Sequence, residues 1–175
     1  MRIAVNISQK QFQLLDLAEM VERVLVESGL EPCWLELEVP ENILLRNDVA
    51  AVQTLGKLSR LGVQITLDNF GIGGSSFCNF RKCPVNALNI DHSLIQNICS
   101  SIDDEALVTA LVSLAKCLKL DIVAEGVETE DQRKLLESLE CTVMQGFLFS
   151  RPLPADDLSR FIKNLKKFKK QLINS

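Results

Sequence analysis

The chain has 175 residues, which is long enough for one well-packed core and short for two domains. Hydrophobic residues make up 47% and charged residues 24%, as is ordinary for a soluble globular protein. The net charge of -4 argues against binding a nucleic-acid polymer, but not against a small phosphate ligand held through metal ions. No apolar run approaches the ~20 residues of a membrane span, and no signal peptide is evident, so we expect a cytoplasmic protein without a transmembrane segment.

Six short apolar runs rich in Val, Ile and Leu predict six β-strands. They span residues 2–5, 34–39, 63–67, 87–90, 121–124 and 142–149. Stretches with helical spacing lie between most of these runs, and strands that alternate with helices form a parallel sheet covered by helices. The strands are almost continuously apolar, as expected where both faces of a sheet are buried. No linker or low-complexity segment interrupts the pattern, so we predict a single α/β domain over residues 1–175.

The first two predicted helices follow the first two strands. Helix one begins at Ser8 and Gln11, which have the spacing of a capping box, and ends at Gly29. Its apolar stripe comprises Leu14, Leu17, Val21, Val24 and Leu25. The second helix spans about residues 48–61 and ends at Gly62.

Two further helices follow the fourth and fifth strands. The third helix spans about residues 104–118 and directs a leucine stripe toward the core. This stripe comprises Leu107, Leu111, Leu114 and Leu118. The fourth helix opens at Thr129, with Gln132 in the capping-box position, and ends near Leu139.

A carboxylate or an amide stands at or just after the carboxyl end of every predicted strand. These residues are Asn6, Glu38, Asp68 with Asn69, Asp91, Glu125 and Gln145. In α/β barrels the active site gathers at this end of the strands. A converging group of acids repels itself unless a cation neutralises it, and oxygen ligands suit Mg²⁺ or Mn²⁺. We therefore predict a metal site, the alternative being six separate caps and turns.

The six cysteines include no Cys-x-x-Cys pair, and the single His92 has no companion for a zinc site. We interpret the cysteines as reduced, mostly buried thiols rather than as disulfides.

Six segments occur in the order in which EAL domains carry them. They are VNIS, LELEVPEN, LDNFGIGGSS, LNIDHSLI, VAEGVET and QGFLFSRPLP. The chain resembles this family over residues 2–154; the family hydrolyses cyclic di-GMP, a bacterial second messenger. The resemblance implies a modified eight-stranded barrel and, in active members, two Mg²⁺ or Mn²⁺ ions. We therefore expect a partial TIM-like (β/α) barrel of the EAL-domain type with about six of the eight strands present.

The resemblance also implies roles for the residues at the strand ends. Asn6, Glu38 and Asp68 would be ligands of the first metal ion. Glu125 matches the acidic residue tied to the second metal ion and to the attacking water. Asn69 stands where the family has a second metal-binding aspartate.

Further roles are implied outside these metal positions. Glu128 matches a catalytic position, and Gln145 matches a further position of the site. Glu41 matches the glutamate that anchors the glycine-rich loop over the site. Arg151 and Pro152 would lie beside the nucleotide.

Several departures from the family pattern bear on activity. Asn69 replaces an aspartate, and a neutral amide bridges two cations poorly. Asn89 replaces the lysine expected near the attacking water and the phosphate. The opening strands, which carry the Glu-Ala-Leu signature and one metal ligand, are absent. The same triplet at residues 105–107 lies in a predicted helix, with Glu105 in its first turn and Leu107 in its core stripe, so we interpret it as a coincidence.

Six strands leave an open barrel with two exposed edges, which predicts self-association or docking on a protein partner. Residues 155–175 predict an amphipathic basic helix. Its apolar stripe comprises Leu158, Phe161, Ile162, Leu165 and Phe168. We expect it to cover the barrel, with an acidic partner or anionic lipid as the alternative role.

Three functions agree with these patterns. The first is a degenerate, non-catalytic EAL-type signalling domain that acts through nucleotide binding, protein binding or both. The second is an active metal-dependent phosphodiesterase that opens cyclic di-GMP to the linear dinucleotide. The third is a fragment of a larger GGDEF-EAL sensor protein whose upstream part supplies the missing ligand.

Overall fold

The computed structural model describes residues 2–14, 16–44, 49–71 and 83–163. These residues contain a parallel sheet of six strands whose order follows the sequence. The strands are β1 (Ile3–Asn6), β2 (Leu35–Pro40), β3 (Gln64–Phe70), β4 (Ala87–Ile90), β5 (Asp121–Glu125) and β6 (Val143–Gln145). Every predicted run therefore forms a strand, although the last strand is shorter than predicted.

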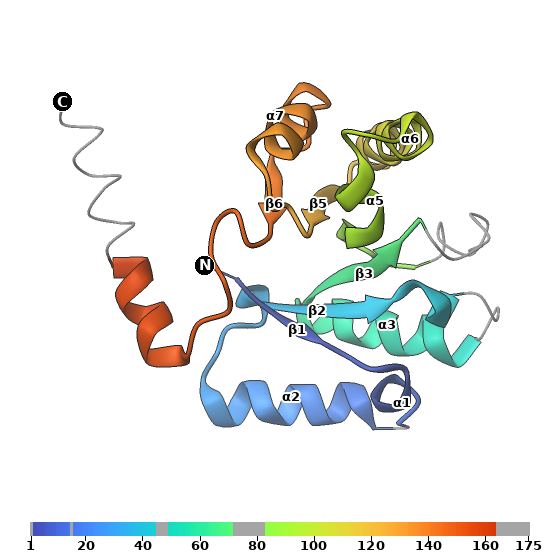
Figure 1. Cartoon of the computed structure of the whole chain (residues 1–175). Helices are drawn as coiled ribbons and strands as arrows, with labels where there is room; N and C mark the ends of the chain where they lie inside the picture. The colour runs from blue at the N-terminus through green and yellow to red at the C-terminus, as the bar shows by residue number, and fades with distance from the viewer. Residues whose placement is uncertain (1, 15, 45–48, 72–82, 164–175) are drawn as a thin grey trace.

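Helices lie in the described connections between strands, apart from the connection of β3 to β4. They are α1 (Gln9–Phe12), α2 (Leu17–Ser28), α3 (Val49–Leu61), α5 (His92–Asn97), α6 (Ile102–Leu118) and α7 (Glu130–Ser138), with short 3-10 turns η1 (Pro32–Trp34) and η2 (Glu41–Leu44) before and after β2. In Figure 1 the sheet curves, and α2, α3, α6 and α7 lie outside the curve. This arrangement is half of a (β/α) barrel, as predicted.

The two faces of the sheet differ in chemistry because alternate residues of a strand point to opposite sides. The outer face, toward the helices, is apolar and includes Leu37, Ile65, Leu67, Leu88 and Ile90, all buried. The concave inner face carries Glu38 on β2, Asn89 on β4 and Glu125 on β5. The sheet thus buries its apolar side and keeps the inner side for polar groups.

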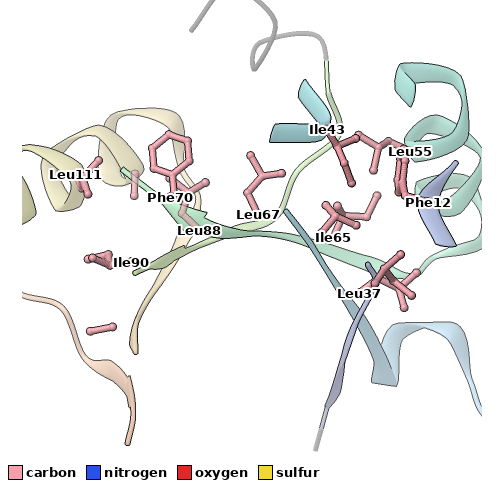
Figure 2. Packing of buried hydrophobic residues seen from close by; sticks show 14 of the residues in the cluster. Phe12, Leu37, Ile43, Leu55, Ile65, Leu67, Phe70, Leu88, Ile90 and Leu111 are labelled. Atoms are coloured by element: carbon pink, nitrogen blue, oxygen red, sulfur yellow. The ribbon is translucent and has the colours of Figure 1, made fainter. Parts of the chain in front are cut away.

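The hydrophobic core lies between the outer face and the helices (Figure 2). Leu55 of α3 and Ile65 of β3 are both completely buried there. Phe70 at the end of β3 and Leu111 of α6 belong to the other part of the same core. Each such side chain stabilises the fold by about 1.5–3 kcal/mol through burial, which fixes the positions of the strand ends.

The first predicted helix is wrong in one respect, because it is two helices. Ser8 and Gln11 do form a capping box, but they cap α1, which ends at Phe12. The helix α2 begins afresh after Asp16 and ends at Gly29, whose φ of 67° is left-handed. Of the predicted stripe, Leu14 and Val24 are exposed, while Leu17, Val21 and Leu25 are buried.

The predicted phase of α6 is also partly wrong. The buried residues of this helix are Val108, Leu111, Val112 and Ala115. Leu107 is 38% exposed, so it does not serve the core as predicted. Glu105 does lie in the first turn, after the cap formed by Ser101, so the Glu-Ala-Leu triplet of this chain is the start of a surface helix. The predicted capping box of α7, between Thr129 and Gln132, is confirmed.

The helix after the last strand is described over residues 155–163 and stands apart from the sheet (Figure 1). Leu158 is 45% exposed and Phe161 is 37% exposed. This described part therefore does not cover the barrel, contrary to expectation. Ile162 is half-buried, whereas Leu165, Phe168 and most of the lysines lie outside the described residues.

Five of the cysteines fall within the described residues, and Cys33, Cys99, Cys117 and Cys141 among them are free thiols. Only Cys141 is buried, whereas Cys33, Cys99 and Cys117 are exposed, so the prediction of mostly buried thiols is wrong. Cys78 lies outside the described residues. In the described part of the chain, no helix combines the length and the apolar character needed to cross a bilayer.

Candidate metal and nucleotide site

The curvature of the sheet brings polar side chains from several strand ends to the inner face. Asn6 on β1 is in register with Glu38 on β2, and Glu125 on β5 is in register with Gln145 on β6. Residues in register on parallel strands point to the same side of the sheet. These four side chains, which the sequence places at strand ends, therefore lie on one face of the sheet.

A bulge in β3 sets the direction of Asp68. Leu67 and Phe70 both face the core although they are three residues apart, and the pairing with β4 shifts between them. Asn69 takes up the additional residue with a left-handed φ of 58°, a conformation that Asn tolerates better than most residues. The bulge keeps Asp68 half-buried at the inner face while Phe70 returns to the core.

Asp68 and Asn69 contact each other. The backbone N–H of Asn69 donates to Asp68 Oδ1 at 2.8 Å, and its side-chain Nδ2 donates to Asp68 Oδ2 at 2.7 Å. Both carboxylate oxygens thus accept from the neighbouring residue. Asn69 itself is exposed. In this structure its amide acts as a partner of the carboxylate rather than as a second charged group.

Asn89 joins two carboxylates across the concave face. Its Nδ2 donates to Glu38 Oε1 at 3.0 Å and to Glu125 Oε1 at 2.8 Å. These partners come from β2 and β5, so the contacts span the intervening strand β3. Asn89 is 1% exposed, and its Oδ1 accepts no hydrogen bond from any described residue.

The electrostatics of the inner face disfavour the ionised acids. Burial raises the pKa of Glu125 to about 7, and the charges of Asp68, Glu38 and Asp91 add to this increase. Burial likewise raises the pKa of Glu38, helped by Asp68. The pKa of Asp68 is raised by burial and by Asp91, while the hydrogen bonds from Asn69 oppose the change. Mutual repulsion in a partly buried site is the condition that a bound cation relieves.

Glu41 lies at the entry to the glycine-rich loop. It is 4% exposed, and its Oε2 accepts from the backbone N–H of Gly71 at 3.3 Å. Gly71 has a φ of 106°, and a Cβ there would approach Leu111 Cδ1 to 2.9 Å. The contact agrees with the anchoring role implied for Glu41, but the loop itself, at residues 72–82, lies outside the described residues.

The other predicted site residues cap a helix or are exposed. Asp91 is a helix cap, since its Oδ1 accepts from the N–H of Ser93 at 2.7 Å. Glu128 is exposed in the turn before α7. Arg151 and Pro152 are exposed after β6, and the Arg151 guanidinium stands 4.7 Å from the centre of the Phe147 ring.

Sequence reasoning did not single out Gly146, which fixes the end of β6. A Cβ at this position would lie 2.1 Å from the backbone oxygen of Val127. Only glycine fits so close an approach, and the approach sets the position of Gln145 and of the segment that follows. The sequence feature that could have indicated this role is that Gly146 directly follows the glutamine at the end of the last strand.

The group contains oxygen donors of the type that Mg²⁺ and Mn²⁺ prefer. Over the described ranges, no three His, Cys, Asp or Glu side chains are close enough to hold a metal ion. Asn89 nevertheless fits a cation site, because its side chain contacts two acids with raised pKa values through Nδ2 and its Oδ1 has no partner among the described residues.

Half of an α/β barrel with acids and amides at the carboxyl ends of its strands is the arrangement of a barrel enzyme or of a domain derived from one. The family description "EAL domain" matches residues 1–152, and the chain belongs to this family.

Known relatives carry the same domain. The bifunctional diguanylate cyclase/cyclic di-GMP phosphodiesterase MucR of Pseudomonas aeruginosa is 44% identical over 156 residues, covering 89% of this chain and 23% of MucR. The structure described as the PaMucR phosphodiesterase in a c-di-GMP complex has a TM-score of 0.87 at 43% identity, covering 90% of this chain and 64% of that one. The manganese/cy-diGMP complex of Klebsiella pneumoniae BlrP1 has a TM-score of 0.79 at 28% identity, covering 86% and 39% of the two chains. The chain thus spans less than a quarter of MucR.

Proposed function

We propose that this chain is an EAL-type signalling domain that binds a divalent cation and cyclic di-GMP at its strand ends and turns the nucleotide over poorly or not at all. The observation that carries the proposal is the neutral amide of Asn89 between Glu38 and Glu125, at 3.0 and 2.8 Å. The family resemblance implies a lysine at this position. A positive charge that would stabilise the charge developing on the phosphate is therefore replaced by a dipole.

The remaining acids have the chemistry for binding. Glu38 and Asp68 would hold Mg²⁺ or Mn²⁺, which when bound would supply Lewis-acid polarisation of the phosphate and neutralise the acids. Glu125, with a pKa of about 7, is suited to accept a proton from water near neutral pH. Glu128 would assist at the rim of the site.

Nucleotide binding would involve the residues after β6. Gln145 is in register with Glu125, and the Arg151 guanidinium would pair with a phosphate oxygen beside Pro152. The similarity to a c-di-GMP complex at 43% identity supports this assignment. MucR is more than four times as long as the matched region, which favours a domain within a larger GGDEF-EAL sensor.

An active phosphodiesterase is the second candidate. It is favoured by the three acids Glu38, Asp68 and Glu125, since the charge of Asp68 helps to raise the pKa of both glutamates. Both candidate functions include binding of cyclic di-GMP, and only the phosphodiesterase hydrolyses it efficiently.

Calorimetry with cyclic di-GMP, with and without Mg²⁺ or Mn²⁺, tests the proposal together with chromatography of the linear product. Binding without product is expected for the unsubstituted chain. The double variant Asn69→Asp with Asn89→Lys should gain hydrolysis, whereas Asn97→Lys, which adds a charge on the exposed end of α5, should not. Turnover by the unsubstituted chain would favour the enzyme, and absence of nucleotide binding would overturn the proposal.

We also propose that the chain pairs with a second copy through its exposed strand edges. On β1, Ile3 is 53% exposed and Val5 is 42% exposed; on β6, Val143 is 52% exposed. Apolar edge strands with free backbone groups pair readily with other strands.

A further inference from the structure

The carboxamide of Asn89 is unequally satisfied at its two ends. Both N–H bonds of Nδ2 are used, one by Glu38 and one by Glu125. The Oδ1 atom accepts from no described residue although the side chain is 1% exposed. Leaving a buried acceptor unsatisfied costs about 1–3 kcal/mol, so such an atom calls for an explanation.

The orientation of the amide follows from the charges around it. With two carboxylate oxygens on one side and no cation between them, the N–H end must face the carboxylates, since the oxygen end would repel both. Rotation by half a turn about the Cβ–Cγ bond exchanges the two ends. That rotation becomes favourable when a cation takes over the neutralisation of Glu38 and Glu125.

We propose that Asn89 is a metal-binding residue of this chain, whose Oδ1 turns toward Glu38 and Glu125 and completes a three-oxygen site for a divalent cation. The inference rests on the cation binding proposed above and is independent of nucleotide binding. It reassigns a position for which the family resemblance implies a lysine, a side chain that cannot ligate a cation in its charged form.

The two contacts of the Asn89 side chain with Glu38 and Glu125 agree with this assignment. After rotation, Oδ1 would occupy the present position of Nδ2, 3.0 Å from Glu38 Oε1 and 2.8 Å from Glu125 Oε1. Adjacent oxygens around an octahedral Mg²⁺ with bonds of 2.0–2.1 Å are separated by about 2.9 Å. The separations of the rotated Oδ1 from the two carboxylate oxygens therefore match those of neighbouring ligands.

The composition of the site leads to the same conclusion. Within the described residues no three acids form a metal-binding cluster, so an oxygen of Asn89 would add to the ligands that the acids supply. Asn89 is held rigidly on β4, which lies next to β5 in the sheet, and its side chain is the one that touches both acids. Three donors from three strands then fix the ion at the concave face.

Binding of Mn²⁺ to the whole chain without nucleotide tests this inference. Free Mn²⁺ is measured by electron paramagnetic resonance for the unsubstituted chain and for the variants Asn89→Leu, Asn89→Lys and Asn89→Asp. Because loss of even an outer partner of a metal ligand weakens affinity by 10–100-fold, Asn89→Leu should weaken binding by at least about tenfold. Asn89→Lys should weaken it further, and Asn89→Asp should preserve or strengthen it.

The variants separate ligation from other roles. Asn and Leu are both neutral. Equal Mn²⁺ affinity of the unsubstituted chain and of Asn89→Leu, with unchanged melting temperatures, would therefore overturn the inference. A purely structural bridge predicts that Asn89→Asp, which repels both glutamates, binds Mn²⁺ more weakly than the unsubstituted chain; that result would also overturn it. Thermal melts without metal show whether each variant is folded, and any variant that is not is replaced by Asn89→Ser, for which the same weakening is expected.

A crystal structure of the unsubstituted chain with Mn²⁺ gives a second readout. Anomalous density within about 2.0–2.3 Å of Asn89 Oδ1 is expected, and density bound only by carboxylates would contradict the assignment. Complete failure to bind Mn²⁺ would overturn both the inference and the proposed cation dependence. Normal Mn²⁺ binding without nucleotide binding would leave the inference intact and overturn only the proposed function.

Discussion

At the scale of single residues, the site is governed by charge in a half-buried environment. Glu125 illustrates this, because burial and three neighbouring acids raise its pKa to about 7. An acid whose pKa is higher in the folded than in the unfolded protein binds its proton more tightly in the folded state. The fold is therefore most stable while Glu125 is protonated, and ionisation works against it.

Stability without metal ions should consequently decrease as the pH rises. The window runs from the ordinary glutamate value of 4.5 to about 7, and the raised pKa values of Glu38 and Asp68 act in the same direction. Melting temperatures measured in chelator between pH 5 and 8 should fall and should be partly restored at pH 8 by Mn²⁺. Glu125→Gln should flatten the profile, whereas Glu22→Gln on the exposed side of α2 should leave it unchanged. A profile that rises with pH would contradict this account.

At the scale of elements, the sequence predicted more of the strands than of the helices. The six strands and the acids at their ends followed from apolar runs, since all strands of a parallel sheet end at one edge. The bulge at Asn69 could not be predicted, because it is defined by pairing with β4. The helix α5 has six residues, too few for a periodic signal. In α6 an error of one residue separated the predicted Leu107 from the buried Val108.

The amide bridge of Asn89 was not predictable either. The sequence indicated a lost charge at this position, but the contacts with Glu38 and Glu125 depend on the curvature of the sheet. In contrast, Glu41 and Gly71 each lie in a motif that the resemblance singled out, and the structure brings the two residues into contact.

Two capping boxes of the same type allow a matched test of helix stabilisation. Gln132 is 6% exposed, and its side chain accepts from the N–H groups of Glu128 and Thr129 and donates to the carbonyl of Ile95 at 3.0 Å. Gln132→Ala should lower the free energy of unfolding by about 2–3 kcal/mol, because a cap is lost and a buried carbonyl is left unsatisfied.

The matched variant is Gln11→Ala in the exposed capping box of α1. It should lower the free energy of unfolding by about 0.5 kcal/mol. Urea titrations of both variants measure the difference. Equal costs would show that the buried contact of Gln132 with Ile95 contributes little.

At the scale of the whole molecule, the half-barrel presents two strand edges with apolar residues beside them. Barrels normally remove such edges by closing, and this sheet is not closed within the described residues. The exposed helix at residues 155–163 leaves further apolar surface on the same molecule.

We therefore expect the isolated chain to self-associate at micromolar concentrations. Size-exclusion chromatography with light scattering should give a mass above that of one chain, 19.5 kDa. The double variant Ile3→Lys with Val5→Lys should shift the mass toward the monomer, since charges on an edge strand oppose pairing. The control Val26→Lys, at a 78% exposed position on α2, should not. A monomeric unsubstituted chain would contradict the prediction.

The amide that connects β2 and β5 also bears on how such a domain changes over generations. In the genetic code, asparagine codons are a single base away from those of lysine and of aspartate, so each of the two exchanged positions can revert by a point mutation. The present amide of Asn89 donates to both Glu38 and Glu125 and so bridges the two acids. The two proposed functions thus differ, at these two positions, by single-base changes in the gene.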